Sequence, residues 1–275
     1  MKPSKEDDMA SPETFQIPLE AAELYESRFV PAIFAEWAPL LVDAAGVGPG
    51  QAVLDVACGT GIVARTAADR IGSAGAVIGL DRNEAMLTVA RRVRPDLTWQ
   101  QGDVANLPFP ARTFDTVLCQ MALMYFPDQV KAIAEMARVT TAGGTVAIAV
   151  PASLTDQPAY EPLADVVIEA AGAEAGALIT ETQWSCGDLD QLRGWFDAAG
   201  LRVETTRTHL GAARFGSIDE LVATEVEGSP LISRIDHATY DDITRGARRA
   251  LRPFVTDTGA VHAPLRGHIV VGRVT

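Results

Sequence analysis

The chain has 275 residues, of which 48% are hydrophobic and 21% are charged, a balance typical of a globular protein that buries a sizeable core. Its formal net charge of −13 opposes approach to a phosphate backbone, so we expect no nucleic-acid partner. Cys58, Cys119 and Cys186 lack C-x-x-C spacing, which predicts neither a disulfide framework nor a metal site. The polar N-terminus precedes no apolar leader, and no apolar run is long enough to span a bilayer; a cytoplasmic protein without membrane insertion is therefore expected.

The N-terminal region is predicted to be helical after a short tail. Residues 1–12 are polar and expected to be disordered. Residues 13–46 carry apolar side chains at helical spacing. Pro31 and Pro39 are expected to break or restart this pattern, because proline lacks a backbone donor and clashes with the preceding turn.

Four short apolar runs follow, and helical segments separate them. Continuous apolar runs of this length suit strands that are buried on both faces. One helix is predicted to start near Asn83 and stop before Pro95, and another to start at Asp128 and stop at Gly143 and Gly144. Strands alternating with helices predict parallel βαβ units in a doubly wound sheet. The runs are residues 53–57, 77–80, 116–119 and 145–150.

The C-terminal half is less regular. A helix capped by Asp188, a strand at 201–210, a helical stretch of about forty residues opened by a capping box at Ser217, and a final strand at 268–274 are predicted. The last two strands are thus separated by an insertion. We therefore assign residues 47–154, 188–211 and 266–275 to the sheet core, and residues 155–187 and 212–265 to a helical cap that covers the substrate.

A glycine turn after the first predicted strand indicates a nucleotide-bearing cofactor. Residues 59–64 fit G-x-G-x-x-A, and Asp81 lies about twenty residues further on, which is the dinucleotide fingerprint. Glycines let the backbone approach a ligand closely, and a carboxylate at the next strand end can accept hydrogen bonds from ribose hydroxyls. NAD and S-adenosylmethionine both fit these features.

Three further features favour S-adenosylmethionine over NAD. Asp55, inside the strand, would oppose a pyrophosphate but suit the ammonium and sulfonium of an amino-acid cofactor. The Gly102-Asp103 pair follows a predicted short strand at 97–100, and its acid can accept from an adenine amine. The third feature is the block Leu-Pro-Phe-Pro at 107–110 followed by Thr-Phe-Asp at 113–115.

Together these motifs resemble a class I S-adenosylmethionine-dependent methyltransferase. The branch is that of small-molecule enzymes similar to the ubiquinone/menaquinone-biosynthesis methyltransferases. Residues 53–61 match the family's first motif, and the resemblance extends over roughly residues 20–150. Ala57 stands where many members have glycine. Because alanine is also small, we expect it to replace glycine at this position without consequence. The resemblance implies an α/β fold: a Rossmann-like doubly wound sheet, mostly parallel with an antiparallel last strand, plus N-terminal helices and the α-helical cap.

The resemblance also implies which residues hold the cofactor. The methionine and ribose portions would be lined by the glycine loop, with Asp55 beneath it and Asp81 on the ribose diol. The adenine would lie beside the Gly102-Asp103 pair. The full set of expected cofactor contacts is Tyr25, Asp55, Ala57, Gly59, Thr60, Gly61, Asp81, Arg82, Met86, Gly102, Asp103, Val104 and Gln120.

The predicted function is methyl transfer to a small, apolar or aromatic metabolite, at an oxygen, nitrogen or carbon. The apolar residues of the cap suggest the substrate class. No catalytic residue is assigned; His262, placed just before the final strand, and Tyr125 are candidates to face the substrate. Two alternatives stay open, an NAD-dependent oxidoreductase and a member of this fold that binds the cofactor without transferring a methyl group. A homodimer is also left open.

Overall fold

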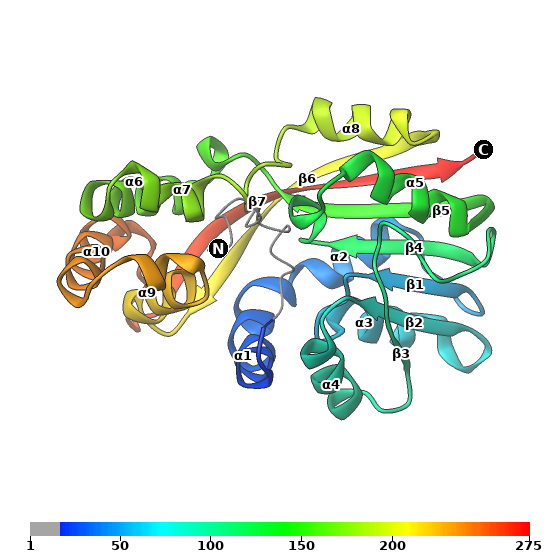
Figure 1. The fold of residues 1–275 in the computed structure, drawn as a ribbon, viewed down its shortest axis with the longest axis horizontal. Helices are drawn as coiled ribbons and strands as arrows, with labels where there is room; N and C mark the ends of the chain where they lie inside the picture. Colours follow the sequence, from blue (N-terminus) through cyan, green and yellow to red (C-terminus); the bar gives the residue numbers. More distant parts are fainter. Residues whose placement is uncertain (1–16) are drawn as a thin grey trace, which may run out of the picture.

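The computed structural model describes residues 17–275, so the predicted tail at 1–12 and residues 13–16 lie outside the described part. Its centre is a seven-stranded sheet with the order β3-β2-β1-β4-β5-β7-β6 (Figure 1). The strands are β1 Ala52–Val56, β2 Ala76–Asp81, β3 Thr98–Gln101, β4 Phe114–Gln120, β5 Thr140–Pro151, β6 Leu201–Phe215 and β7 Val261–Val274.

The strand directions confirm the predicted fold class. Strands β1 to β5 pair in parallel, whereas β7, the last strand of the chain, lies antiparallel to both β5 and β6. Helices α3 Ile62–Ile71, α4 Glu84–Val93, α5 Gln129–Val139 and α8 Leu189–Ala198 flank the sheet. Buried apolar clusters lie on both faces of the sheet, as expected for a doubly wound fold.

Predicted helix starts agree closely with the structure. Asn83, Asp128 and Asp188 each accept a hydrogen bond from a backbone N–H in the first turn of the helix that follows, which is the function of an N-cap. The predicted stop at Gly143 and Gly144 is wrong. Helix α5 ends at Val139 because the next residue already pairs with Phe114 as the first residue of β5.

Of the two N-terminal prolines, Pro31 does not interrupt its helix, whereas Pro39 lies where a new helix starts, as predicted. Helix α1 Leu19–Leu24 runs on into η1 Tyr25–Phe34, a wide π-type helix that contains Pro31. In this π-type helix a backbone N–H donates to the carbonyl five residues earlier instead of four, as the Ala35 N–H does to the Val30 carbonyl. Pro39 lies in the first turn of α2 Trp37–Ala44. Backbone N–H groups of the first turn have no partner within the helix, so a residue that lacks this N–H is tolerated there.

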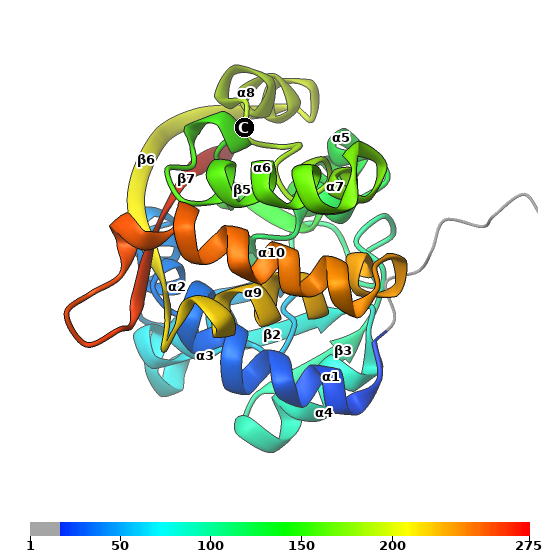
Figure 2. The same ribbon diagram turned by 90° about the vertical axis from the view of Figure 1, so that its left-hand side faces the viewer.

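A separate helical layer lies beyond the carboxyl ends of the parallel strands (Figure 1). It comprises α6 Tyr160–Ala171, α7 Ala173–Thr180, α9 Ile218–Glu227, the short turn η5 Pro230–Arg234, and α10 His237–Ala250. Figure 2 shows α10 between α6 and α9. These helices share a buried apolar cluster of their own. We keep the name cap for them, and the division into core and cap remains our proposal.

The last two strands are longer than predicted. Strand β6 continues to Phe215 and β7 begins at Val261, so the pair extends from the sheet to the cap. The prediction that placed His262 before the final strand is therefore wrong. His262 lies within β7, opposite Arg214, and is exposed. Burial alternates in the missed segments 211–215 and 261–267. However, Gly211, Pro264 and Gly267 are residue types that do not favour strands, which explains why the sequence pattern missed these segments.

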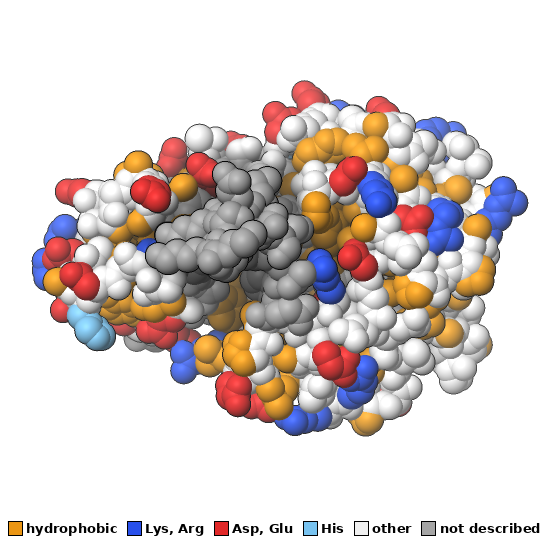
Figure 3. Space-filling model, viewed as in Figure 1, with side chains coloured by type: hydrophobic (Ala, Val, Ile, Leu, Met, Phe, Trp, Pro, Cys, Tyr) orange, Lys and Arg blue, Asp and Glu red, His pale blue; other side chains and the backbone are white. Residues whose placement is uncertain are grey.

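Surface charges are mixed on the face drawn in Figure 3, where Lys and Arg side chains are scattered among Asp and Glu. None of the described helices combines the length and the apolar character needed to cross a membrane.

The Leu-Pro-Phe-Pro block is held by one ion pair of α5. Arg138 donates to the carbonyls of Leu107 and Phe109 and to the Glu135 carboxylate, and Glu135 accepts from the Leu107 N–H at 2.9 Å. These bonds satisfy backbone groups of an irregular loop that has no strand partner, so the pair fixes the path between β3 and β4.

We expect Arg138→Ala to lower the free energy of unfolding by about 2 kcal/mol, because two loop carbonyls and a carboxylate lose a charged donor. Urea unfolding followed by circular dichroism measures this. Arg193→Ala on α8 is the control, since its ion pair with Asp190 is exposed and 3.8 Å long, and should change stability by less than about 0.5 kcal/mol. Equal effects of the two variants would contradict the anchoring role.

Candidate cofactor site

The glycine loop and the end of β2 meet at the carboxyl edge of the sheet. The Cys58 N–H donates to the carbonyl of Leu80, which holds the two strand ends together. One Asp81 oxygen accepts from the Gly59 N–H at 2.7 Å, and the other accepts from the Asn83 N–H at 2.8 Å. Asp81 thus bridges the loop and the start of α4. Desolvation raises the pKa of this carboxyl, although three backbone N–H groups oppose the rise.

Asp55 lies beneath the loop, inside β1. It is 1% exposed and accepts from the Ala64 N–H in the first turn of α3 at 2.9 Å. Its pKa is raised to about 8, chiefly by desolvation; the bond from Ala64 opposes the rise, the nearby Asp81 adds to it, and the charge of Arg65 opposes it. A cation above the loop would therefore stabilise the ionised form of this carboxylate.

Backbone strain is present at the start of the loop. Ala57 adopts a φ of 54°, in the left-handed region that favours glycine. This conformation costs a non-glycine residue about 1–2 kcal/mol. The alanine that replaces the family's glycine is therefore conformationally strained here, a cost that its small size did not predict. Gly61, at the end of the loop, has a φ of 91°, and a Cβ there would lie 2.2 Å from the Trp99 ring.

Tyr25 from η1 lies over the loop. Its hydroxyl is 3.6 Å from the position that a Cβ would take on Gly59. The ring stacks on Phe29 and on Phe34, with centroid distances of 5.7 and 5.3 Å. Desolvation, then Tyr125 and Asp81, raise the pKa of the hydroxyl, so it is neutral and available as a donor.

Three polar atoms around the loop are buried and have no hydrogen-bond partner within the described chain. They are the Thr60 hydroxyl, the side-chain nitrogen of Asn83 and the Gln120 carbonyl oxygen. The side-chain nitrogen of Gln120, at the end of β4, donates a hydrogen bond to the Phe34 carbonyl at 3.2 Å. Buried polar atoms without partners are costly, so their grouping here fits a polar ligand. Asn83 was not among the predicted contacts; its N-cap position two residues after Asp81 was the available signal.

The remaining predicted contacts lie after β2 and β3. The Gly102 N–H donates to the Asp81 carbonyl, which keeps the Gly-Asp pair beside the loop. Asp103 accepts from the Ala105 N–H at 2.8 Å and lies 3.9 Å from Arg82; both side chains are about half-exposed.

Met86 and Val104 are buried. Met86 packs against Ala22 and Val89, with Tyr25 alongside, so its side chain contributes to packing near the site. Val104 belongs to the cluster that fills one face of the sheet. The structure therefore places all thirteen predicted contacts around one end of the sheet, while His262 lies outside this group in β7.

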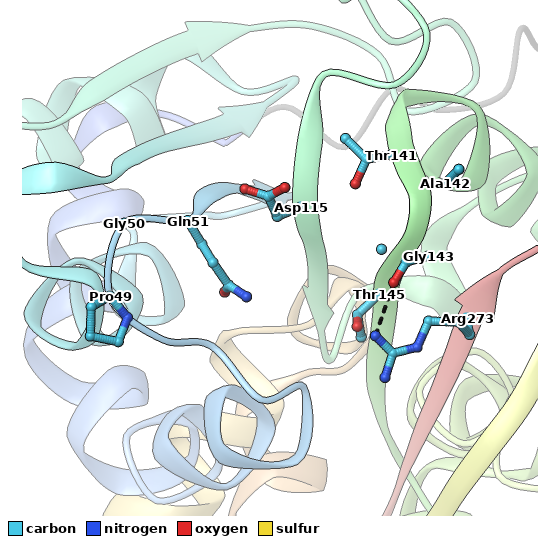
Figure 4. Close-up of a pocket in the computed structure, with 10 residues that line it drawn as sticks. Pro49, Gly50, Gln51, Asp115, Thr141, Ala142, Gly143, Thr145 and Arg273 are labelled. Carbon is cyan, nitrogen blue, oxygen red and sulfur yellow. Dashed lines mark hydrogen bonds between the residues drawn. The ribbon is translucent and has the colours of Figure 1, made fainter.

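A hollow lies at the opposite edge of the sheet, where the parallel strands begin. It has a volume of about 410 Å³, and Figure 4 shows Asp115, Gln51 and Arg273 around it. Ligands of open parallel sheets bind outside the carboxyl ends of the strands, and none of the predicted contacts lines this hollow. It is therefore not our candidate site. In the described part of the chain, no cluster of His, Cys, Asp or Glu could hold a metal ion.

Comparisons with known proteins agree with this geometry. Residues 53–144 match the family described as a methyltransferase domain. The ubiquinone/menaquinone biosynthesis C-methyltransferase UbiE of Saccharophagus degradans is 31% identical over 179 residues, which cover 60% of this chain and 72% of the relative. A demethylmenaquinone methyltransferase of Renibacterium salmoninarum is 44% identical over 114 residues, or 41% of this chain and 46% of the relative. The chain thus spans about half the length of the first curated relatives it matches.

Solved structures share the fold at lower identity. The YcgJ protein of Bacillus subtilis gives a TM-score of 0.60 at 19% identity, covering 86% of this chain and 97% of that protein. The [4+2]-cyclase SpnF gives 0.53 at 17% identity, covering 87% and 80%. From the relative that is matched over most of its length, the chain belongs to the class I S-adenosylmethionine-dependent methyltransferases, in the branch of the ubiquinone/menaquinone-biosynthesis enzymes.

Proposed function

We propose that this protein is an S-adenosylmethionine-dependent methyltransferase that acts on a small, apolar or aromatic metabolite of the quinone type. The observation that carries the proposal is the set of buried polar groups around the glycine loop. Asp55 and Asp81 are carboxylates that burial disfavours as anions, and three neighbouring polar atoms have no partner in the described chain. A ligand with an ammonium, a ribose and an amino-acid carboxylate supplies partners for such groups.

Each part of the cofactor has a matching group in the chain. Asp81 would accept from the ribose hydroxyls and Asp103 from the adenine amine. Asp55 would stabilise the ammonium through the loop above it. Bound S-adenosylmethionine supplies an activated methyl group, so the chain's task is to align the acceptor and exclude water, which is worth about 7–11 kcal/mol for well-aligned reactants.

The alternative of an NAD-dependent oxidoreductase has less support. A pyrophosphate on the glycine loop would lie above Asp55, whose 1% exposed carboxylate already resists ionisation. A second anion there adds repulsion without adding a partner. The unpartnered Gln120 oxygen and the neighbouring Tyr25 hydroxyl are also better matched to an amino-acid moiety than to a nicotinamide.

The substrate side of the proposal rests on the cap and on the relatives. The cap presents a largely apolar interior to the carboxyl edge of the sheet, and the matched relatives are named for ubiquinone and menaquinone biosynthesis. The same proposal includes a cytoplasmic location, a free small-molecule substrate and the lack of a nucleic-acid partner. It also includes a homodimer, which a measurement of molecular mass in solution would test.

Replacing Asp81 tests the cofactor site. We expect Asp81→Asn to weaken the binding of S-adenosylhomocysteine about 10- to 100-fold, because a charged acceptor for the ribose hydroxyls is lost. Isothermal calorimetry measures the dissociation constant. The control is Asp190→Asn, whose side chain is 96% exposed on α8 and should leave binding unchanged. Binding of NADH, and not of S-adenosylhomocysteine, to the wild type would overturn the proposal.

The pH dependence of stability tests Asp55. Its folded-state pKa of about 8 lies above the ordinary value of 3.8, so the folded protein binds more protons than the unfolded chain between these pH values. The free energy of unfolding should therefore fall as the pH rises through this window. Asp55→Asn keeps an acceptor for Ala64 but cannot ionise, so the variant should gain stability relative to the wild type by up to about 1 kcal/mol per pH unit.

Urea unfolding at pH 5, 6.5 and 8 gives the difference between the two proteins. Asp81 is present in both proteins, so only its electrostatic coupling to Asp55 enters this difference. Saturating S-adenosylhomocysteine should stabilise the wild type more than Asp55→Asn, because only the wild type offers its ammonium a carboxylate. Parallel pH curves for the two proteins would show that Asp55 does not carry the raised pKa.

A further inference from the structure

One arginine connects the first turn of η1 to the glycine loop. Arg65, on α3, donates to the Thr60 carbonyl at 2.9 Å and to the Glu26 carboxylate at 3.0 Å. The ion pair is mostly buried, since 13% of the Arg65 side chain and 21% of the Glu26 side chain are exposed. The guanidinium therefore joins η1, α3 and the loop at a single point. We call these three groups, Glu26, Arg65 and the Thr60 carbonyl, the clamp.

The Glu26 carboxylate depends on Arg65. Its second oxygen, Oε2, is buried and has no hydrogen-bond partner among the described residues. Removing one partner of a buried ion pair leaves the other charge uncompensated, so such a pair resists separation. The neighbouring pair of Glu23 and Arg92 differs in this respect, because its side chains are 49% and 56% exposed and water can replace either partner.

The clamp fixes the position of Tyr25, the residue before Glu26. The Tyr25 hydroxyl is 3.6 Å from the position that a Cβ would take on Gly59. Its ring stacks on Phe29 and on Phe34, which belong to η1 as well. The stacked rings therefore move with the helix, and their position relative to the glycine loop depends on how the first turn of η1 is attached.

The other end of η1 is attached independently of the clamp. Gln120 of β4 donates to the Phe34 carbonyl at 3.2 Å, and Glu36, two residues after η1, accepts from Arg214 of β6. Loss of the clamp would therefore leave the helix on the sheet and change the position of its first turn, where Tyr25 lies.

We propose that Glu26 is a positioning residue for the amino-acid end of the cofactor: through Arg65 it holds η1 on the glycine loop and so places the Tyr25 hydroxyl where the cofactor carboxylate binds. This proposal rests on the proposed methyltransferase function. A neutral tyrosine hydroxyl can donate to a carboxylate. The Arg65 guanidinium also interacts electrostatically with Asp55, and thereby reduces the repulsion that the acidic side chains around the loop exert on a carboxylate.

Two ligands that differ in the carboxylate test which part of the cofactor the clamp serves. S-adenosylhomocysteine carries this carboxylate, and its decarboxylated analogue keeps only the ammonium at that end. We expect Glu26→Ala, and equally Tyr25→Phe, to weaken the binding of S-adenosylhomocysteine about tenfold and to leave the binding of the analogue within about twofold of wild type. Isothermal calorimetry measures both dissociation constants. Binding of the analogue also reports that each variant is folded.

The double variant tests whether Glu26 acts through Tyr25. Its loss of affinity for S-adenosylhomocysteine should stay near tenfold, because each single change removes the same interaction. Glu26→Gln keeps an acceptor for Arg65 and should lie within about threefold of wild type. Glu23→Gln is the matched control, since this acid on α1 belongs to the exposed pair with Arg92, and it should bind both ligands as wild type does.

Four results would overturn the role of Glu26. They are unchanged binding in Glu26→Ala, equal weakening of both ligands, multiplied losses in the double variant, and a Glu26→Gln variant as weak as Glu26→Ala. Failure of S-adenosylhomocysteine to bind wild type would instead overturn the methyltransferase function. Calorimetry of that ligand with the wild type alone therefore separates the two failures.

Discussion

The hydrogen bond from the Gly59 N–H to the Asp81 carboxylate is the contact on which the site depends. It joins the loop after β1 to the end of β2, and the second Asp81 oxygen holds the start of α4 through Asn83. One side chain therefore fixes the loop, the strand end and a helix start relative to one another. Because both bonds are to backbone groups, the carboxylate keeps lone pairs free for a ligand while its position is already determined.

Burial of carboxylates is a shared feature of the proposed cofactor site and the cap. Asp55 and Asp81 beneath and beside the loop, and Glu225 in the cap, all have raised pKa values for which desolvation is the largest cause. A protein that is stable in spite of such groups has an unfavourable electrostatic term that a ligand can relieve.

The long β6–β7 pair makes the two sites parts of one structure. Both strands leave the sheet and continue to the cap, where Phe215 and Val261 are buried in its apolar cluster. The π-type helix η1 approaches from the other side and brings Tyr25 over the loop and Phe29 against the end of α9. Substrate and cofactor regions are thus positioned by continuous elements, which hold a geometry more precisely than loops do.

The sequence by itself determined the parallel part of the sheet, the N-caps at Asn83, Asp128 and Asp188, and the glycine loop with its two acidic residues. These features are local: apolar runs, capping side chains and a turn each depend on neighbours within a few residues. The tertiary structure alone decided the lengths of β6 and β7, the passage of a helix through Pro31, and the position of His262 in a strand. It also decided the pairing of Glu225 with Tyr160 across the cap, because contacts between residues 65 positions apart, and the desolvation they cause, exist only once the chain has folded.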